Sequence, residues 1–335
     1  MRRYQELKTR GQVARLRGIA RDMADQFGWA DADMRLLNHG YNTTFGLRKG
    51  DERAALRINV NSQRSMAELK GELAWVHALE ESEVWVPQPT LKRDGTGYLA
   101  ELSSRRLMPE REESDRIYAV LYGWLPGRTA GHNWTPEVAR AVGVATTQLH
   151  DHARAWDRPN DAYYSTPRDV MIGCPLNPRA ERPGFDTVLE RGNAVIDRLH
   201  RDQPLMPVHF DIHMWNLKWY RGKLAVFDFD DCRLGWPAWD VAITLFYMRR
   251  FANPVECEAA YWEGLGRTLE DLGVSHEEME ALIASRGVFL ASEMLGEWTA
   301  DLQQIGTGYV DVTEKRVQHY LETGIFDPNV ATLPS

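Results

Sequence analysis

The sequence predicts an α+β fold with two lobes, a small β-rich N-terminal lobe and a larger, mainly helical C-terminal lobe. Residues 34–59 alternate between short strands and turns, whereas helical apolar patterns dominate from Thr135 onward. Between these regions an apolar strand stops at Gly123 and breaks into Pro126-Gly127. A chain of 335 residues is long enough for two lobes. We expect a helical extension at 1–29, an N-lobe at 30–122, a hinge at 123–127 and a C-lobe at 128–335.

Composition and charge narrow the class of protein. The chain is 43% hydrophobic and 26% charged, which is typical of a globular protein. Its net charge of -8 and the lack of a basic patch argue against a nucleic-acid partner. The three cysteines show no paired spacing, which argues against disulfides and a zinc site. Residues 1–10 lack a signal-peptide pattern, and the apolar run at 241–248 is too short to span a bilayer. We expect a cytoplasmic enzyme without a membrane partner, of unspecified oligomeric state.

The N-lobe is expected to combine two helices with a set of strands. Residues 5–27 form an amphipathic pattern rich in Lys and Arg, and we expect this helix to pack on the lobe rather than on a membrane. A second apolar stripe predicts a helix at 65–80. Strands are expected within 34–59, with a turn at 38–44, and again at 98–102 and 116–122.

The C-lobe is expected to be a series of helices. Thr135-Pro136 is typical of a helix start. Residues 156–190 are rich in Pro and Gly, so we expect them to form an irregular segment on the surface. After a central polar stretch, helical patterns predict four further helices, at 242–251, 255–272, 276–304 and 314–323.

The central polar stretch, residues 209–240, carries the strongest chemical signal. It contains Asp211, Asn216 and Asp228, with a predicted hairpin between the last two. A hairpin brings Asn216 and Asp228 together, and paired oxygen ligands suit Mg²⁺. A third carboxylate nearby can accept the proton of an attacking hydroxyl. This combination indicates phosphoryl transfer, although a surface loop rich in Asp is the plainer alternative.

The stretch resembles the aminoglycoside phosphotransferase and type II homoserine kinase branch of the protein-kinase-like superfamily. That branch usually reads His-Gly-Asp-Leu-His-Pro-Gly-Asn in the loop and Ile-Asp-Phe-Asp-Asp in the strand. His209, Asp211, His213 and Asn216 match the first pattern, and Asp228, Asp230 and Asp231 match the second. Asp240 falls at the position of a further Asp that the family has beyond this strand. Phe210 replaces a usual Gly, and Met214-Trp215 replace Pro-Gly, which puts the loop's backbone shape in question.

The resemblance implies a two-lobed kinase-like fold that uses ATP and Mg²⁺. It makes Asp211 the base, Asn216 and Asp228 the metal ligands, and His209, Asp230, Asp231 and Asp240 supporting residues. It also places nucleotide contacts at Asn42, Thr43 and Thr44 in the first turn, at Arg57 paired with Glu72, and at the backbone of Gly123 and Leu125.

The phosphate acceptor is less well defined by the sequence. The family favours a hydroxyl on a small molecule, such as an amino alcohol or a homoserine-like or aminoglycoside-like compound. A Ser/Thr protein kinase of the stress-response-kinase type is the alternative. Three carboxylates, Glu293, Glu297 and Asp301, would share one face of the helix expected at 276–304, where they would attract an amino-bearing acceptor unless they form a solvated helix face.

Two further functions compete with a kinase. His209-x-Asp211-x-His213 also resembles a metal cluster, so a metal-dependent phosphohydrolase is one rival. An inactive nucleotide-binding protein is the other rival. Oxygen ligands at Asn216 and Asp228 favour Mg²⁺ over zinc, and the presence of a base at Asp211 favours an active enzyme.

Overall fold

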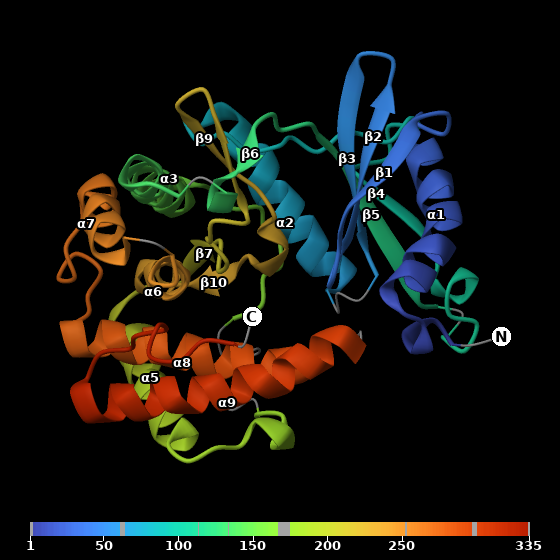
Figure 1. Ribbon diagram of the computed structural model, residues 1–335. Coiled ribbons are helices and arrows are strands. Elements are labelled where there is room, and N and C mark those ends of the chain that lie inside the picture. Colours follow the sequence, from blue (N-terminus) through green and yellow to red (C-terminus); the bar gives the residue numbers. More distant parts are fainter. Residues whose placement is uncertain are drawn as a thin grey trace. The chain divides into compact units, whose positions relative to one another are not determined.

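A five-stranded antiparallel sheet with the order β1-β2-β3-β5-β4 forms the centre of the first of two compact units (Figure 1). This computed structural model describes residues 3–60, 64–112, 114–132, 134–166, 175–251, 253–296 and 300–333, with only the backbone at 300–304. The first unit consists mainly of Met1–Leu69 and Pro87–Leu125. Its strands are β1 (Asp33–His39), β2 (Thr43–Lys49), β3 (Glu52–Asn59), β4 (Leu99–Ser103) and β5 (Arg116–Gly123).

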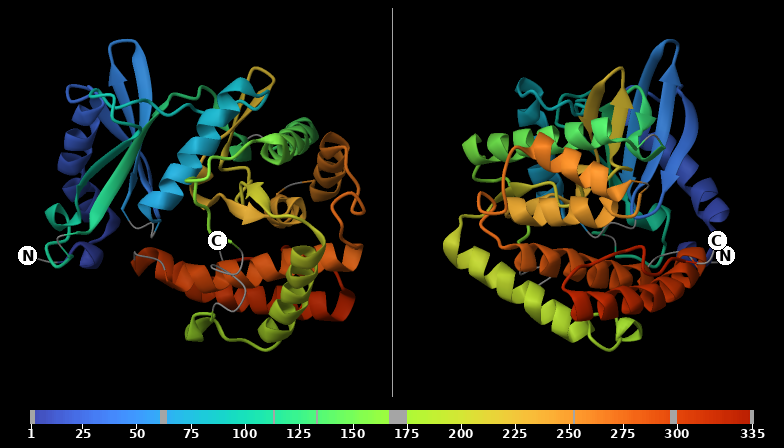
Figure 2. Two further views of the ribbon diagram at one scale, coloured as in Figure 1. Left: turned by 180° about the vertical axis from the view of Figure 1, so that it is seen from behind. Right: turned by 60° about the vertical axis from the view of Figure 1, so that its left-hand side comes forward.

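The N-terminal helix α1 (Thr9–Gln26) runs along one face of this sheet (Figures 1 and 2). Its apolar stripe, including Leu16, Ile19 and Met23, is buried in the same core as Phe45 and Leu56 of the sheet. Burial of such a stripe stabilises a helix more than its intrinsic propensity does. The arginines of α1 stay at least partly exposed, and Arg17 and Arg21 donate to the carbonyl oxygens of Met34 and Ala30.

Helix α2 (Met66–Ala78) begins in the first unit and continues into the second. The second unit otherwise comprises Pro126–Glu297 and Leu302–Ser335. It holds the two-stranded sheet β7 (Met206–Val208) and β10 (Arg233–Gly235), and the sheet β6 (Arg128–Thr129), β8 (Leu217–Tyr220) and β9 (Lys223–Val226). Its other helices are α3 (Pro136–Ala155), α5 (Phe185–Asp202), α6 (Pro237–Met248), α7 (Pro254–Leu265), α8 (His276–Leu295) and α9 (Ala300–Thr323).

Several helix boundaries follow from local chemistry. The Thr135 hydroxyl accepts a hydrogen bond from the Val138 N–H, 3.3 Å away, and so caps α3 as the sequence predicts. The helix expected at 255–272 is too long, because Gly266 adopts a left-handed conformation that ends α7. The sequence does not predict α5, because the Pro- and Gly-rich residues before it favour an irregular segment.

The single helix expected at 276–304 is wrong. Helix α8 ends at Leu295, and α9 begins at Ala300 and runs beside α8 in Figures 1 and 2. A Cβ atom at Gly306 would lie 2.6 Å from the Met294 carbonyl oxygen, so only glycine permits this close approach. The apolar pattern continues across the break, which is why the sequence predicts one helix.

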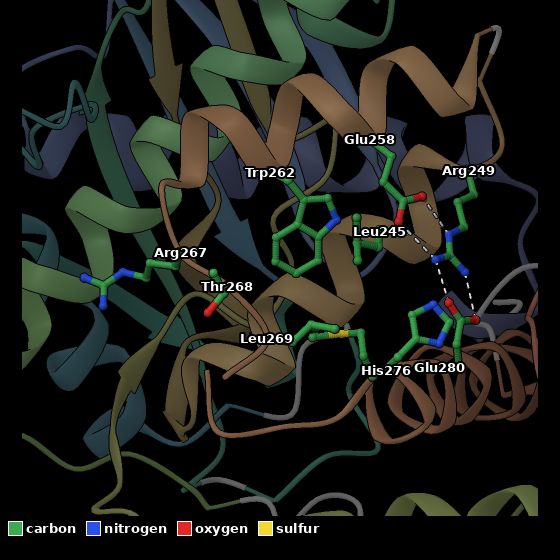
Figure 3. A pocket seen from close by; sticks show the side chains of 10 residues that line it. Leu245, Arg249, Glu258, Trp262, Arg267, Thr268, Leu269, His276 and Glu280 are labelled. Atoms are coloured by element: carbon green, nitrogen blue, oxygen red, sulfur yellow. Dashed lines mark hydrogen bonds and ion pairs between the residues drawn. The ribbon is translucent and has the colours of Figure 1, made fainter. Parts of the chain in front are cut away.

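A largely buried ion-pair network joins α6, α7 and α8 around a cavity of about 350 Å³ (Figure 3). The Arg249 guanidinium donates to both Glu258 oxygens, at 3.0 and 3.1 Å, and to both Glu280 oxygens, at 2.9 and 2.7 Å. Burial would lower the pKa of Arg249, but the two carboxylates outweigh it and raise the pKa above its usual range.

No helix in the described part of the chain is both long and apolar enough to cross a membrane.

We predict that Glu280→Gln lowers the free energy of unfolding by about 3 kcal/mol, because it leaves the largely buried Arg249 short of one charge partner. Urea unfolding of both proteins measures this difference. The control is Glu263→Gln, which removes an exposed partner of Arg140 and should cost less than about 1 kcal/mol. Equal losses in the two variants would contradict a structural role for the Arg249 network.

Candidate active site

The loop between β7 and β8 carries Asp211 and Asn216, and β9 leads directly to Asp228. Leu217 pairs with Val226, and the Phe227 N–H donates to the Asn216 carbonyl oxygen, at 3.0 Å. This register brings Asn216 and Asp228 to the same end of the hairpin, as the sequence predicts. All three residues belong to the second unit, so their arrangement is fixed within one compact body.

A fully buried carboxylate, Asp240 near the start of α6, holds the entry to this loop. One of its oxygens, Oδ1, accepts the Phe210 N–H at 2.6 Å. The other, Oδ2, accepts the His209 N–H at 3.1 Å and lies 3.0 Å from Nε2 of His150. Charge-assisted hydrogen bonds of this kind are about twice as strong as neutral ones, so Asp240 fixes the loop's backbone firmly.

The surroundings of Phe210 explain how it can stand in place of glycine. Its φ of 68° lies in the left-handed region, which costs a bulky residue roughly 1–2 kcal/mol. The Phe210 ring stacks on Trp239 with centroids 5.8 Å apart, and the Arg233 guanidinium lies 4.1 Å from the ring centroid. Asp231 in turn accepts from Arg233 at 2.9 Å. Burial and ring contacts therefore stabilise a backbone shape that glycine usually provides.

His209 is a structural residue of the loop. Its ring is fully buried, with Nε2 3.2 Å from the Phe227 carbonyl oxygen and Nδ1 accepting the Asp211 N–H at 3.3 Å. Burial lowers the pKa of His209, so the ring is neutral. Because both ring nitrogens are hydrogen-bonded inside the protein, His209 is unsuited to bind a metal, which argues against the hydrolase alternative.

Asp211 lies among cationic and polar partners. Its Oδ2 is 3.1 Å from Nε2 of His213 and accepts from the Asn216 side-chain amide at 2.9 Å. Its Oδ1 is 3.4 Å from Nη2 of Arg286. Burial would raise the pKa of Asp211, but the nearby charges and the hydrogen bond of His213 outweigh it and hold the pKa well below its usual range. Asp211 is therefore ionised.

The donor set of Asn216 and Asp228 fits Mg²⁺. The Asn216 amide nitrogen points to Asp211, at 2.9 Å from Oδ2 and 3.1 Å from the carbonyl oxygen, so its amide oxygen faces away from Asp211. Asp228 has a left-handed backbone, with φ of 65°, at the start of the short 3₁₀ helix that contains Asp230 and Asp231. Amide and carboxylate oxygens are the ligands that Mg²⁺ takes in proteins. The two assignments stay predictions.

Two residues that the sequence analysis missed complete the surroundings of Asp211. Arg286 of α8 donates to the Tyr247 hydroxyl of α6 at 3.1 Å, and the rings of His213 and Tyr247 lie 4.6 Å apart. Burial raises the pKa of Tyr247 to about 12. The available signal was a single Arg within the otherwise apolar middle of α8.

The prediction that Glu293, Glu297 and Asp301 share one face of a single helix is wrong. Glu293 lies on α8 and is 3.3 Å from Nη1 of Arg286, whereas Asp301 belongs to α9. Glu297 and the side chain of Asp301 lie outside the described residues. Glu293 therefore lies beside the site as an ion-pair partner of Arg286. A contact between these carboxylates and the acceptor stays a prediction.

The first unit contains most of the predicted nucleotide contacts. Thr44 pairs directly with Arg57 across β2 and β3, so the two side chains share one face of the sheet. Thr43 faces the other way, is fully buried, and its hydroxyl is 2.8 Å from Nδ1 of His39. Asn42 accepts from the Asn59 amide at 2.9 Å. This geometry makes Thr44 a better phosphate contact than Thr43.

The remaining nucleotide residues stay predictions. The Gly123 N–H donates to the Gln88 carbonyl oxygen at 2.9 Å, which leaves the Gly123 carbonyl as the group for an adenine edge. Leu125 ends the first unit. Glu72 is buried on α2, in the part of that helix that belongs to the second unit, and its pairing with Arg57 likewise stays a prediction.

The antiparallel sheet, the helical second unit, the β7–β8 loop with Asp211 and Asn216, and Asp228 after β9 indicate a phosphotransferase with a kinase-like fold. The family model described as "Phosphotransferase enzyme family" matches residues 33–278, so the chain belongs to this family. The predicted resemblance, enzyme class and fold are thereby confirmed.

Individual relatives agree with this assignment. Amicoumacin kinase of Bacillus subtilis (strain 168) is 22% identical over 251 residues, which cover 73% of this chain and 72% of the relative. The structure of a microcompartment-associated aminopropanol kinase is similar with a TM-score of 0.72 and 19% identity, covering 93% of this chain and 99% of that one. The structure of an amicoumacin kinase in complex with AMP-PNP, Ca²⁺ and Ami is similar with a TM-score of 0.69 and 16% identity. The match covers 91% of this chain and 96% of that one.

We predict that Asp240→Asn lowers phosphoryl transfer by about 10²-fold, because a displaced loop misplaces Asp211, and an error of about 1 Å can have an effect of that size. Transfer rates at saturating substrate measure the loss. The matched control is Asp202→Asn, which makes the same chemical change at a half-exposed carboxylate at the end of α5. A full transfer rate in Asp240→Asn would contradict the proposed positioning.

The low pKa of Asp211 predicts a pH dependence of stability. An unfolded Asp titrates near 3.8, whereas the folded carboxylate titrates below this value. Its stabilising contribution is therefore complete above the unfolded pKa and is lost as the pH falls below it. Between pH 5 and about 3, the free energy of unfolding should fall more steeply for the wild type than for Asp211→Asn. Parallel curves in urea unfolding would contradict this assignment.

Proposed function

We propose that this enzyme transfers the γ-phosphoryl group of ATP to a hydroxyl of a small molecule, with Asp211 as the base. The observation that carries the proposal is the carboxylate of Asp211, 2.9 Å from the amide of Asn216 and 3.1 Å from Nε2 of His213, on a loop held by Asp240. The acceptor oxygen forms a bond to the γ-phosphorus while the bond to the β,γ-bridging oxygen breaks. ADP keeps the electron pair, and the hydroxyl proton goes to Asp211.

The low pKa of Asp211 agrees with this kind of transfer. A carboxylate that is ionised at every physiological pH orients the acceptor hydroxyl and accepts its proton late, when the bond to phosphorus has largely formed. His213 and Arg286 hold the two carboxylate oxygens from different sides. Catalysis then depends mainly on positioning and charge.

Asn216 and Asp228 would hold Mg²⁺, and the ion, when bound, would neutralise charge on the β- and γ-phosphates. Asp230 and Asp231 support this end of the site. Phe229 packs against His209, with ring centroids 4.5 Å apart, and against Trp75 at 5.4 Å. These contacts pack the residue that follows Asp228, whose own backbone is left-handed.

The nucleotide contacts extend the proposal to the first unit. We assign Arg57, paired with Glu72, to the α- and β-phosphates, and the turn at Asn42, Thr43 and Thr44 to the remaining phosphate oxygens. The backbone of Gly123 and Leu125 would bind the adenine edge. The shared sheet face of Thr44 and Arg57 supports this assignment.

A small-molecule acceptor and a cytoplasmic location complete the proposal. The relatives named as kinases of amicoumacin and of aminopropanol act on small molecules, which supports an acceptor of the same kind. ATP is a cytoplasmic cosubstrate. A protein Ser or Thr acceptor is the competing possibility.

Incubation with γ-³²P-labelled ATP, Mg²⁺ and a panel of hydroxylated compounds tests the proposal. The panel contains amino alcohols, hydroxy acids, aminoglycosides and a Ser/Thr-rich protein such as casein. Label in a small-molecule product supports the proposal. Label in the protein alone favours a protein kinase, and release of inorganic phosphate without any labelled acceptor overturns phosphoryl transfer.

We predict that Asp228→Asn abolishes the tightening of ATP binding by Mg²⁺, because it removes the carboxylate of the proposed metal site. Calorimetry with and without Mg²⁺ measures the effect. Asp186→Asn, on the first turn of α5, is the control and should bind like the wild type. Unchanged metal dependence in Asp228→Asn would move the metal site elsewhere.

A further inference from the structure

Two arginines, Arg250 and Arg286, lie beside Tyr247, and a third, Arg316, lies beside Tyr309. We call Arg250, Arg286 and Arg316 the arginine cluster. The guanidinium carbons of Arg250 and Arg286 lie 5.7 and 5.8 Å from the centre of the Tyr247 ring. Arg250 also donates to the Tyr309 hydroxyl, and Arg316 lies 5.6 Å from the ring of Tyr309. The cluster thus extends from Asp211 along Tyr247 to α9.

The three arginines of the cluster differ in how many carboxylates lie near them. Arg286 is balanced by Asp211 at 3.4 Å and Glu293 at 3.3 Å. Arg250 instead contacts the faces of Phe246, Tyr247 and Tyr309, and Arg316 donates to the Ala331 carbonyl oxygen at 3.0 and 2.7 Å. Within the described ranges, neither Arg250 nor Arg316 makes an ion pair of 4.0 Å or less.

Buried N–H groups of the cluster lack hydrogen-bond acceptors. Among the described residues, Nε of Arg250, Nε of Arg286 and Nη1 of Arg316 are buried without a partner. A buried donor without an acceptor costs about 1–3 kcal/mol, so three in one place call for an explanation. Anionic oxygens are the groups that satisfy guanidinium donors best.

The guanidinium groups of the arginine cluster also repel one another. Burial and the neighbouring charges of Arg316 and Arg286 lower the pKa of Arg250 to about 10. Burial lowers the pKa of Arg316 to about 10 as well, although Asp327 acts in the opposite direction. An anion bound at this position would relieve both effects.

We propose that the acceptor carries an acidic group, a carboxylate or a phosphate monoester, which Arg250 binds together with Arg286 while the acceptor hydroxyl meets Asp211. The inference rests on the proposed function, whose acceptor it specifies. Arg250 is partly exposed and so can be reached by a ligand, whereas Arg316 is buried. This anion subsite is an alternative to the amine contact that the sequence analysis expects at Glu293, Glu297 and Asp301.

The cavity in Figure 3 does not compete for this role. Both of its arginines already have carboxylate partners, since Arg249 is bound by Glu258 and Glu280, and Arg267 by Asp151. Leu245 and Arg249 of the cavity lie four residues apart on one face of α6, whereas Tyr247 points to another face. The anion subsite and the cavity are therefore separate.

Matched acceptors test the proposal with wild-type enzyme, ATP and Mg²⁺. The probes are ω-hydroxy carboxylates of three to six carbons, the corresponding hydroxyalkyl phosphates, the neutral amides, and the amino alcohols. We expect kcat/KM for at least one acidic series to exceed that for its amides and amino alcohols by about tenfold or more. Comparing the carboxylates with the phosphates identifies the acidic group. A preference for the amino alcohols, or equal use of acid and amide, would overturn the inference.

Variants of Arg250 separate anion recognition from packing. Arg250→Met should lower kcat/KM for the acid by about tenfold or more and leave that for the amide nearly unchanged, whereas Arg250→Lys should restore much of the preference. A purely structural role would lower both values together and would overturn the inference. Arg201→Met, which removes the same charge at the exposed end of α5, is the control and should change neither value.

A binding experiment keeps this inference distinct from the proposed function. Calorimetry with the AMP-PNP and Mg²⁺ complex measures the affinity for each acid and its amide in the wild type and in Arg250→Met. Tighter binding of an acid that depends on Arg250 supports the anion subsite, even if no transfer occurs and the proposed function fails. Transfer to neutral acceptors without such binding leaves the proposed function intact and overturns the subsite.

Discussion

The structure of the site depends on the buried carboxylate of Asp240. It accepts the N–H groups of His209 and Phe210 and lies 3.0 Å from His150 of α3, so one side chain joins α6, α3 and the loop. A buried carboxylate is stable only when its oxygens are hydrogen-bonded, so these elements must keep their positions together. The Thr244 hydroxyl, one turn further along α6, lies 3.0 Å from the Ile212 carbonyl oxygen and extends this support to the next part of the loop.

The reacting groups follow from this constraint. A fixed loop places Asp211 between His213 and Arg286, and the resulting low pKa keeps the carboxylate ionised. The Asn216 amide bonds to the same carboxylate, so the proposed base and one proposed metal ligand are positioned by one loop. Arg286 then links the base to Tyr247 and to the arginine cluster. The proposed base, metal site and anion subsite thus form one connected network within the second unit.

The sequence predicted those parts of the molecule that short-range patterns encode. The hairpin, the cap at Thr135, the strands of the first unit and the spacing of Asp211, Asn216 and Asp228 are local features, and the structure shows them close to the expected residues. The close approach of Gly306 in α9 to the Met294 carbonyl of α8 is a tertiary contact that no local pattern encodes, so the sequence does not separate the two helices. Arg286 and Tyr247 come from separate helices, and although an Arg in the apolar middle of α8 was a signal, only the tertiary structure shows that Arg286 contacts Asp211 and Tyr247. The left-handed Phe210 likewise depends on Trp239 and Arg233.

In the proposed reaction, Asp211 acts on the acceptor hydroxyl and does not bind the nucleotide. Single-turnover transfer from γ-³²P-labelled ATP, measured for the wild type and Asp211→Asn with an acceptor from the panel, tests this role most directly. We expect the rate to fall by about 10²-fold or more while the Kd for ATP with Mg²⁺ stays the same. A wild-type rate in the variant, or a loss of ATP affinity that accounts for the decrease, would contradict the proposed role of Asp211.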